Sequence, residues 1–184
     1  MDHKILRILV LGVVMGMFDG SDDEVVVHPQ TLASMDEEKK RQFLDMMSQL
    51  ESSGGINTKH REISSGIHKG QRAVGNYGLM PNTIREMYKR MGKDADPRLK
   101  EIVDNSQDDQ MLANSIAADP ELENVVAGKL YDRVNERFGG DQEKMNYAWQ
   151  YGHNLSPSKL TSDKLENDRT EKFRLLKKVV KPKE

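Results

Sequence analysis

The chain has 184 residues, a formal net charge of −2, 36% hydrophobic and 32% charged residues, and no cysteine. This length fits one domain with a buried core and is too short for two ordinary domains. The near-neutral charge argues against nonspecific nucleic-acid binding, and the absence of cysteine excludes a disulfide framework and a thiolate zinc site.

The N-terminal residues 4–18 place Lys4 and Arg7 before an apolar run. This order is typical of a secretion signal, but no small-x-small cleavage site precedes residues 18–20. The run is also shorter than the roughly 20 apolar residues that cross a bilayer. A packing segment, a secretion signal and a shallow membrane-inserting segment therefore stay open, and the acidic residues 19–33 are expected to form a linker.

The first helix is predicted to begin at Ser34, which forms a capping box with Glu37. Apolar residues then recur at helical spacing and predict one buried face: Phe43, Met46, Met47 and Leu50. Two glycines, at positions 54 and 55, stop the helix and leave Glu51 at its C-terminal edge. A negative charge is mildly unfavourable there, so its presence favours a functional role for Glu51.

Residues 56–81 contain four glycines and no sustained hydrophobic period, which predicts a long loop. A loop of this length in a compact domain is usually functional or disordered. Helices are then predicted over residues 82–91, 97–103 and 108–118. Asp119 and Pro120 begin a long helix that ends at residues 139–140, and a further helix runs from Asp141 to residue 151. One amphipathic helix is expected near residues 163–180, so the predicted fold class is all-α.

Three blocks of sequence, Glu51-Ser52-Ser53-Gly54, Gly75-Asn76-Tyr77-Gly78-Leu79-Met80 and residues 119–152, follow one another along the chain. In this order they resemble motifs of the superfamily of lytic transglycosylases and goose-type lysozymes. The first block looks like its Glu-Ser signature, and the second resembles its Gly-x-x-Gly-Leu-Met turn. Residues 119–152 are similar to its Asp-Pro…Asn-Ile…Phe-Gly-Gly…Ala-Tyr-Asn-x-Gly pattern. The chain departs from the family with Pro81 where Gln is usual, and with Trp149-Gln150 where Tyr-Asn is usual.

The resemblance covers about residues 37–155 and implies a lysozyme-like helical domain over residues 35–156 with a glycine-rich active-site loop. Residues 1–34 would then be an N-terminal apolar segment and linker. Residues 157–184 would be a charged, helical C-terminal extension. These boundaries are expectations from the family pattern combined with the change in composition at each flank.

The resemblance also implies a reaction with one catalytic carboxyl group, whereas glycoside hydrolases normally use two. Glu51 would protonate the oxygen between N-acetylmuramic acid and N-acetylglucosamine, and would then accept the proton of the muramoyl 6-hydroxyl. Such a group must begin protonated, which an apolar cleft favours because desolvation penalises a charged carboxylate. We therefore expect Glu51 to lie beside Met80, Tyr147 and Trp149. Glu62 is the alternative acid, because its distance from Gly78 suits short-loop members.

Substrate contacts are expected from the residues of the three blocks and from one loop histidine: Ser52, His60, Tyr77, Gly78, Leu79, Met80, Tyr147, Trp149 and Gln150. Trp149, Tyr147 and Tyr77 are also candidates for ordinary core packing. No metal site is expected, since no His-Glu-x-x-His places two ligands on one helix face. The implied reaction needs no cofactor.

The expected partner is peptidoglycan, which places the protein outside the cytoplasm or in a bacteriophage particle, because virion-borne members are common in this family. Residues 1–34 and 157–184 would attach it to other virion or envelope proteins. Membrane contact by the N-terminal segment stays open, and nucleic acid is not expected. The alternatives are a hydrolytic goose-type lysozyme and a non-catalytic structural or adaptor protein that retains the lysozyme fold.

Overall fold

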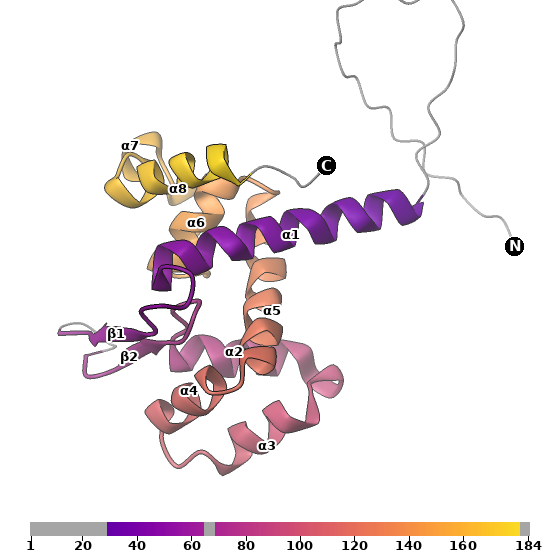
Figure 1. Cartoon of the computed structure of the whole chain (residues 1–184), viewed down its shortest axis with the longest axis vertical. Coiled ribbons are helices and arrows are strands. Elements are labelled where there is room, and N and C mark those ends of the chain that lie inside the picture. The colour runs from indigo at the N-terminus through magenta and orange to yellow at the C-terminus, as the bar shows by residue number, and fades with distance from the viewer. Residues whose placement is uncertain (1–28, 65–68, 181–184) are drawn as a thin grey trace, which may run out of the picture.

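The computed structural model describes residues 29–64 and 69–180, which form a mostly helical protein (Figure 1). The predictions for residues 4–18 and 19–28 lie outside these ranges. The helices are α1 (Pro29–Ser52), α2 (Pro81–Met91), α3 (Pro97–Asn105), α4 (Asp109–Ala117), α5 (Pro120–Phe138), α6 (Gln142–Tyr151), α7 (Ser162–Leu165) and α8 (Asp168–Val179). Two 3-10 turns, Gly92–Asp94 and Pro157–Lys159, join them. No helix of the described ranges is long and apolar enough to cross a membrane.

Helix α1 begins five residues before the predicted capping box, at Pro29 rather than Ser34. The prediction of a linker up to residue 33 is therefore wrong for residues 29–33. Proline is well tolerated in the first turn of a helix, and the next four residues contain no helix breaker. Figure 1 shows the N-terminal turns of α1 extending beyond the other helices, whereas its C-terminal half packs against them.

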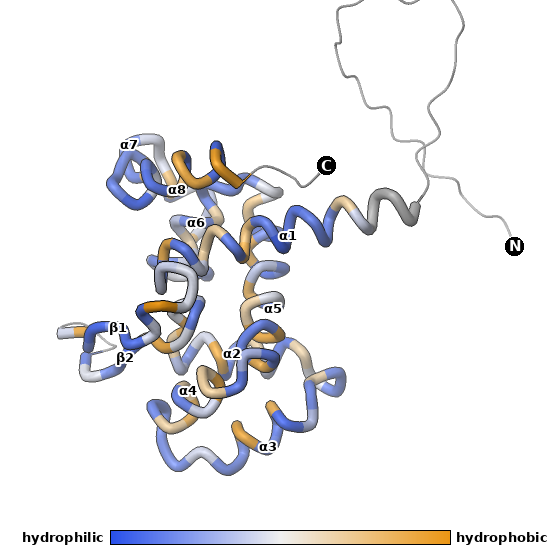
Figure 2. The backbone as a smooth tube through the Cα atoms, viewed as in Figure 1, coloured by the Kyte–Doolittle hydropathy of each residue, from blue (hydrophilic) through white to orange (hydrophobic). Residues whose placement is uncertain are grey.

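The predicted long loop contains a short β-hairpin, which is a second correction. Strand β1 (Lys59–Glu62) pairs antiparallel with β2 (Arg72–Val74) through an irregular register. Pattern reasoning missed it because β1 is hydrophilic along its length (Figure 2) and shows no apolar alternation. Val74, which pairs with Lys59, directly precedes the glycine turn.

Helix α5 is the central element of the core and packs against α1, α2, α4 and α6. Its buried face includes four apolar residues that recur at every fourth position: Val126, Leu130, Val134 and Phe138. The carboxylate of Asp119 caps its N-terminus by accepting the backbone N–H groups of Glu121 and Leu122, both at 3.1 Å. Gly139 ends it in the left-handed conformation, so both predicted ends of this helix are confirmed.

The C-terminal residues form two helices instead of the single one predicted. The chain breaks between α7 and α8 because Asn167 caps α8, its side-chain oxygen accepting the Thr170 N–H at 2.9 Å. Helix α8 packs on α1 and α6. Phe173 is fully buried, and its ring centroid lies 6.0 Å from that of Phe43. This segment therefore contributes to the core and is more than a solvated extension.

A polar contact joins the middle of α2 to the residues that follow α6. Nε2 of His153 donates to Oε2 of Glu86 at 2.7 Å, and the side-chain amide of Asn154 donates to the same oxygen at 3.0 Å. Partial burial works to raise the pKa of Glu86, but hydrogen bonds from His153, Asn154 and Arg90 outweigh it. They lower the pKa to about 2, from an ordinary value of 4.5.

Because the pKa of Glu86 is lower in the folded chain, its contribution to stability is complete above pH 4.5 and is lost as the pH falls towards about 2. We expect Glu86→Gln to lower the free energy of unfolding by about 1–2 kcal/mol at pH 7, after allowing for solvent screening. Urea denaturation should show this deficit shrinking by about half at pH 3. Glu101→Gln, at an exposed position of α3, is the control. An equal deficit at both pH values would contradict this assignment.

Candidate active site

Glu51 lies in the last turn of α1, with its side chain 17% exposed. The helix ends here because Ser53, Gly54 and Gly55 all have positive φ, a conformation that ends α-helices. Oε2 of Glu51 faces Gly78, since a Cβ added to Gly78 would lie only 2.8 Å from that oxygen. The fold thus brings the predicted acid into contact with the predicted glycine turn.

Residues 75–78 form a tight turn closed by two hydrogen bonds between Val74 and Leu79. The N–H of Val74 donates to the Leu79 carbonyl at 3.0 Å, and the N–H of Leu79 donates back at 2.9 Å. Gly75 and Gly78 have φ of +74° and +62°, where a side chain is strained. A Cβ on Gly75 would also overlap the carboxylate of Glu123. Each glycine of this Gly-x-x-Gly turn therefore has a carboxylate packed closely against it.

The turn is fastened to α1 through the side chain of Asn76. The hydroxyls of Ser48 and Ser52 both donate to Oδ1 of Asn76, each at 2.7 Å. The hydroxyl oxygen of Ser52 accepts the N–H of Gly55 at 2.8 Å, and Ser52 is 1% exposed. Ser52, predicted as a substrate contact, therefore faces the turn and holds it beside Glu51.

Glu123 holds the same turn from the first turn of α5. Its buried carboxylate accepts the N–H of Tyr77 at 3.0 Å. Burial raises the pKa of Glu123, opposed by backbone hydrogen bonds from Tyr77 and Asn76 and by the nearby His60. Nε2 of His60 donates to the Gly75 carbonyl at 3.0 Å. His60, also a predicted substrate contact, thus supports the turn from the hairpin side.

Two predicted aromatic residues are tied to the turn through polar groups. Nε1 of Trp149 donates to the Tyr77 carbonyl at 3.1 Å, and the Tyr77 hydroxyl donates to Oδ1 of Asn124 at 2.6 Å. Tyr77 is 7% exposed, and the half-buried Trp149 has its ring centroid 5.8 Å from that of Phe43. Both rings therefore connect the turn to the core, and Trp149 keeps part of its surface accessible.

The other predicted contacts are dispersed around this centre. Leu79 is buried in the core, whereas Met80 is half-buried at the start of α2. On α6, the ring of Tyr147 packs against Tyr151 with centroids 4.4 Å apart, and Gln150 is exposed.

Glu62, the alternative acid, lies on the hairpin strand β1. Its side chain is 54% exposed, and its carboxylate accepts a 3.4 Å hydrogen bond from Arg72. A carboxyl group this open to water lacks the desolvation that the implied chemistry requires. Its setting therefore contrasts with that of Glu51, which is enclosed and lies at the turn.

Arg169, a residue that the sequence did not nominate, contacts Glu51 directly. Its Nη2 lies 2.7 Å from Oε1 of Glu51, and the two side chains are 13% and 17% exposed. Nε of Arg169 also donates to Oδ1 of the buried Asn146 at 3.0 Å. The expected apolar surroundings of Glu51 are thus incomplete, because a cation from α8 lies against one of its two oxygens.

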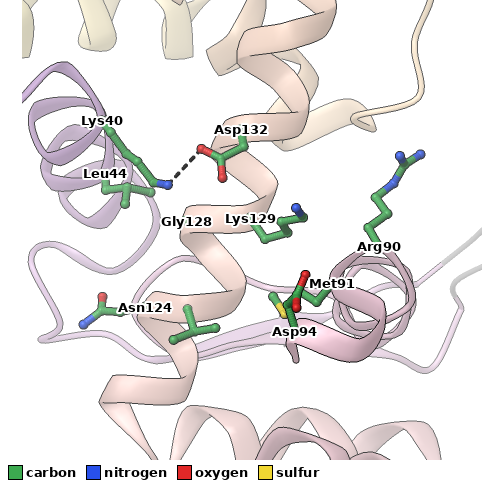
Figure 3. Close-up of a pocket in the computed structure, with 10 residues that line it drawn as sticks. Lys40, Leu44, Arg90, Met91, Asp94, Asn124, Gly128, Lys129 and Asp132 are labelled. Atoms are coloured by element: carbon green, nitrogen blue, oxygen red, sulfur yellow. Dashed lines mark hydrogen bonds and ion pairs between the residues drawn. The ribbon is translucent and has the colours of Figure 1, made fainter. Parts of the chain in front are cut away.

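A separate hollow of about 490 Å³ lies between α1, α2 and α5 (Figure 3). Lys40 and Asp132 face each other across part of it, with Nζ donating to Oδ1 at 2.8 Å. Its remaining lining residues are Leu44, Arg90, Met91, Asp94, Asn124, Val125, Gly128 and Lys129. Glu51 does not line this hollow, and the lining carries both positive and negative side chains. We therefore assign it no part in chemistry at Glu51.

Comparisons with family models, with curated proteins and with solved structures find no match to this chain. Function is therefore inferred from the residues around Glu51. The sequence did not nominate Glu123 or Arg169 as members of this site. The sequence feature that could have indicated Glu123 is that it is a second acidic residue in the first turn of α5. The feature that could have indicated Arg169 is its positive charge in the first turn of α8, where the helix dipole disfavours a cation.

Gly78→Ala tests the close approach of the turn to Glu51. The new Cβ would displace the carboxylate and strain the backbone, so we expect the sugar-cleaving activity that the resemblance implies to fall about 100-fold. Stability should fall by about 1–2 kcal/mol. Gly139→Ala is the matched control, because Gly139 has φ +59° and open space around an added Cβ. It should lose similar stability and keep its activity. Equal activity in both variants, measured with labelled peptidoglycan, would show that the contact has no catalytic importance.

Proposed function

We propose that the chain is a peptidoglycan lytic transglycosylase with a lysozyme-like helical domain and Glu51 as its single catalytic acid/base. The observation that carries the proposal is the position of Glu51. Glu51 lies in the last turn of α1, and its enclosed carboxyl group presents Oε2 to Gly78. The motifs that resemble the Glu-Ser and Gly-x-x-Gly-Leu-Met signatures are thus in contact, although a long segment separates them in the chain.

In the proposed reaction, Oε2 of Glu51 donates its proton to the oxygen that links N-acetylmuramic acid to N-acetylglucosamine. The bond between that oxygen and the muramoyl C1 breaks, and its electron pair stays on the oxygen. The muramoyl 6-hydroxyl then attacks C1, and its proton passes to the carboxylate of Glu51. The product carries a 1,6-anhydro ring, the acid is regenerated, and no water molecule is consumed.

The surroundings of the turn suit a glycan strand in the proposed complex. Trp149 is half-buried and fixed by its hydrogen bond to the Tyr77 carbonyl, and aromatic faces of this kind pack against sugar rings. Met80 and Tyr147 are also half-buried, and Gln150 is exposed on α6 with an amide for hydroxyl or N-acetyl groups. We propose these four as substrate contacts, with Ser52 and His60 supporting the turn.

The proposed substrate lies outside the cytoplasm, so the protein would act in the periplasm or cell wall, or from a bacteriophage particle that opens the wall. Residues 1–34 are the proposed attachment segment to virion or envelope proteins. In the C-terminal segment, Lys177 and Lys178 on the exposed side of α8 would supply the remaining contacts, because Phe173 on the same helix is buried.

A second candidate function is a non-catalytic structural or adaptor protein with the same fold. The observation that favours it is the ion pair between Arg169 and Glu51. Ion pairs of this kind also occur in proteins without catalytic activity. A hydrolytic goose-type lysozyme is the alternative within the same enzyme class, and would need a second group to hold water.

The proposal is tested by incubating the purified full chain with isolated, dye-labelled peptidoglycan. Release of soluble labelled fragments is the expected result, and the fragments should carry no new reducing ends, because the 1,6-anhydro ring blocks them. Soluble fragments with reducing ends would establish a hydrolase instead. No release by the folded protein would support the structural candidate.

A further inference from the structure

Helix α8 brings a charged side chain to the proposed acid from the opposite end of the chain. Arg169 is in its first turn, two residues after the capping residue Asn167. The next residue, Thr170, is buried, and Phe173 anchors the helix against Phe43 on α1. The position of Arg169 is therefore fixed by the core packing of its own helix.

Arg169 is held between two partners on different helices. Nη2 donates to Oε1 of Glu51 at 2.7 Å, and Nε donates to Oδ1 of Asn146 on α6 at 3.0 Å. Asn146 is fully buried, so it is a fixed anchor for the guanidinium group. A planar guanidinium group bound at two points has little freedom to turn. The geometry therefore fixes the direction from which Arg169 approaches Glu51.

The two oxygens of Glu51 consequently have different surroundings. Oε1 accepts the hydrogen bond from Arg169, whereas Oε2 faces the Gly78 backbone. A hydrogen-bond donor on Oε1 disfavours a proton on that oxygen, because the carbonyl oxygen of a neutral carboxyl group is a better acceptor than its hydroxyl oxygen. The proton of a neutral Glu51 would then reside on Oε2, on the side of the glycine turn.

Charges near the two helix ends are also complementary. Glu51 lies at the C-terminal end of α1 and Arg169 at the N-terminal end of α8. The negative charge of Glu51 is unfavourable at the C-terminal end of α1 but favourable near the N-terminal end of α8. The positive charge of Arg169 is unfavourable at the N-terminal end of α8 but favourable near the C-terminal end of α1. Their pairing brings these ends together in a setting where both side chains are largely enclosed. Electrostatic stabilisation is stronger there than in water.

We propose that Arg169 is a positioning residue for the reaction at Glu51. It keeps the acidic proton on Oε2 and stabilises the carboxylate that forms when this proton passes to the glycosidic oxygen. The carboxylate later accepts the proton of the muramoyl 6-hydroxyl, which regenerates the acid. This inference rests on the proposed function and makes α8 a part of the active site.

The test measures kcat and KM of the full chain on soluble glycan strands for the wild type, Arg169→Ala, Arg169→Lys and Arg174→Ala. Arg174 is a matched control, because it is also an ion-paired arginine of α8 but contacts Glu143 and Glu166. We expect Arg169→Ala to lower kcat about 100-fold with KM changed less than about threefold. Arg169→Lys keeps the charge without the planar fork and should recover kcat to about tenfold below the wild type. Arg174→Ala should keep its kcat.

An unchanged kcat in a folded Arg169→Ala variant would overturn the inference, and so would a change confined to KM. A rise in kcat would also overturn it, because α8 would then be an inhibitory cap. Should Arg169→Ala not fold, Arg169→Lys decides, and a wild-type kcat in that variant refutes the positioning role. A wild type without activity would instead overturn the proposed function, which separates the two failures.

Discussion

Glu51→Gln is expected to lower peptidoglycan cleavage about 1,000-fold, the scale of losing a general acid. Glutamine keeps the size of the side chain and an oxygen that can face Arg169, but it has no proton to donate at neutral pH. Soluble fragment release from labelled peptidoglycan measures the effect. Arg169 loses its charged partner in this variant, which can lower its stability. Urea denaturation of the same preparations therefore checks that the variant is folded.

Glu62→Gln is the matched control for this variant. Glu62 lies on β1 with its side chain 54% exposed and paired with Arg72, so its loss should leave more than about half of the activity. If Glu62→Gln removed activity and Glu51→Gln kept it, the catalytic role would belong to the hairpin. Full activity in both variants would exclude either carboxyl group as the acid.

Phe173→Ala is expected to lower the free energy of unfolding by about 3–5 kcal/mol, as for other large aromatic side chains removed from a core. Phe173 is fully buried and packs against Phe43 on α1, so the variant leaves a cavity between α1 and α8. Urea denaturation followed by circular dichroism measures the loss. Since α8 carries Arg169, activity should fall as well, even where most molecules are still folded.

Leu175→Ala is the control on the same helix, because Leu175 is 54% exposed. Its effect on the free energy of unfolding should stay within about 0.5 kcal/mol. A loss below about 1 kcal/mol for Phe173→Ala would mean that α8 docks only weakly on α1. The packing that fixes Arg169 would then be inadequate for the role proposed here.

The elements with strong local signals were predicted well. Asp119 and Asp141 cap α5 and α6 through their own side chains, and Gly139 ends α5 with positive φ. These signals depend on residues within one turn of the helix end, so they can be read from the chain directly. The hairpin was missed because β1 has no buried face, and its pairing partner follows a long interval.

The site was predictable only in part, for a related reason. The family resemblance nominated Glu51 and Gly78, which the structure brings together. Arg169 is 118 residues away from Glu51 in the sequence, and the contact depends on how α8 packs. The bond from Glu123 to the turn spans 46 residues. No local pattern reports such contacts, because they arise from tertiary packing of separate helices.

The most direct test of the central claim is mass spectrometry of the fragments released from isolated peptidoglycan by the wild-type chain, with Glu51→Gln run beside it. The proposal predicts muropeptides with 1,6-anhydro ends from the wild type, each lighter than the hydrolytic product by one water molecule, and almost none from the variant. Muropeptides with reducing ends would contradict the transglycosylase reaction. Equal release by the wild type and a folded Glu51→Gln variant would contradict the role of Glu51 itself.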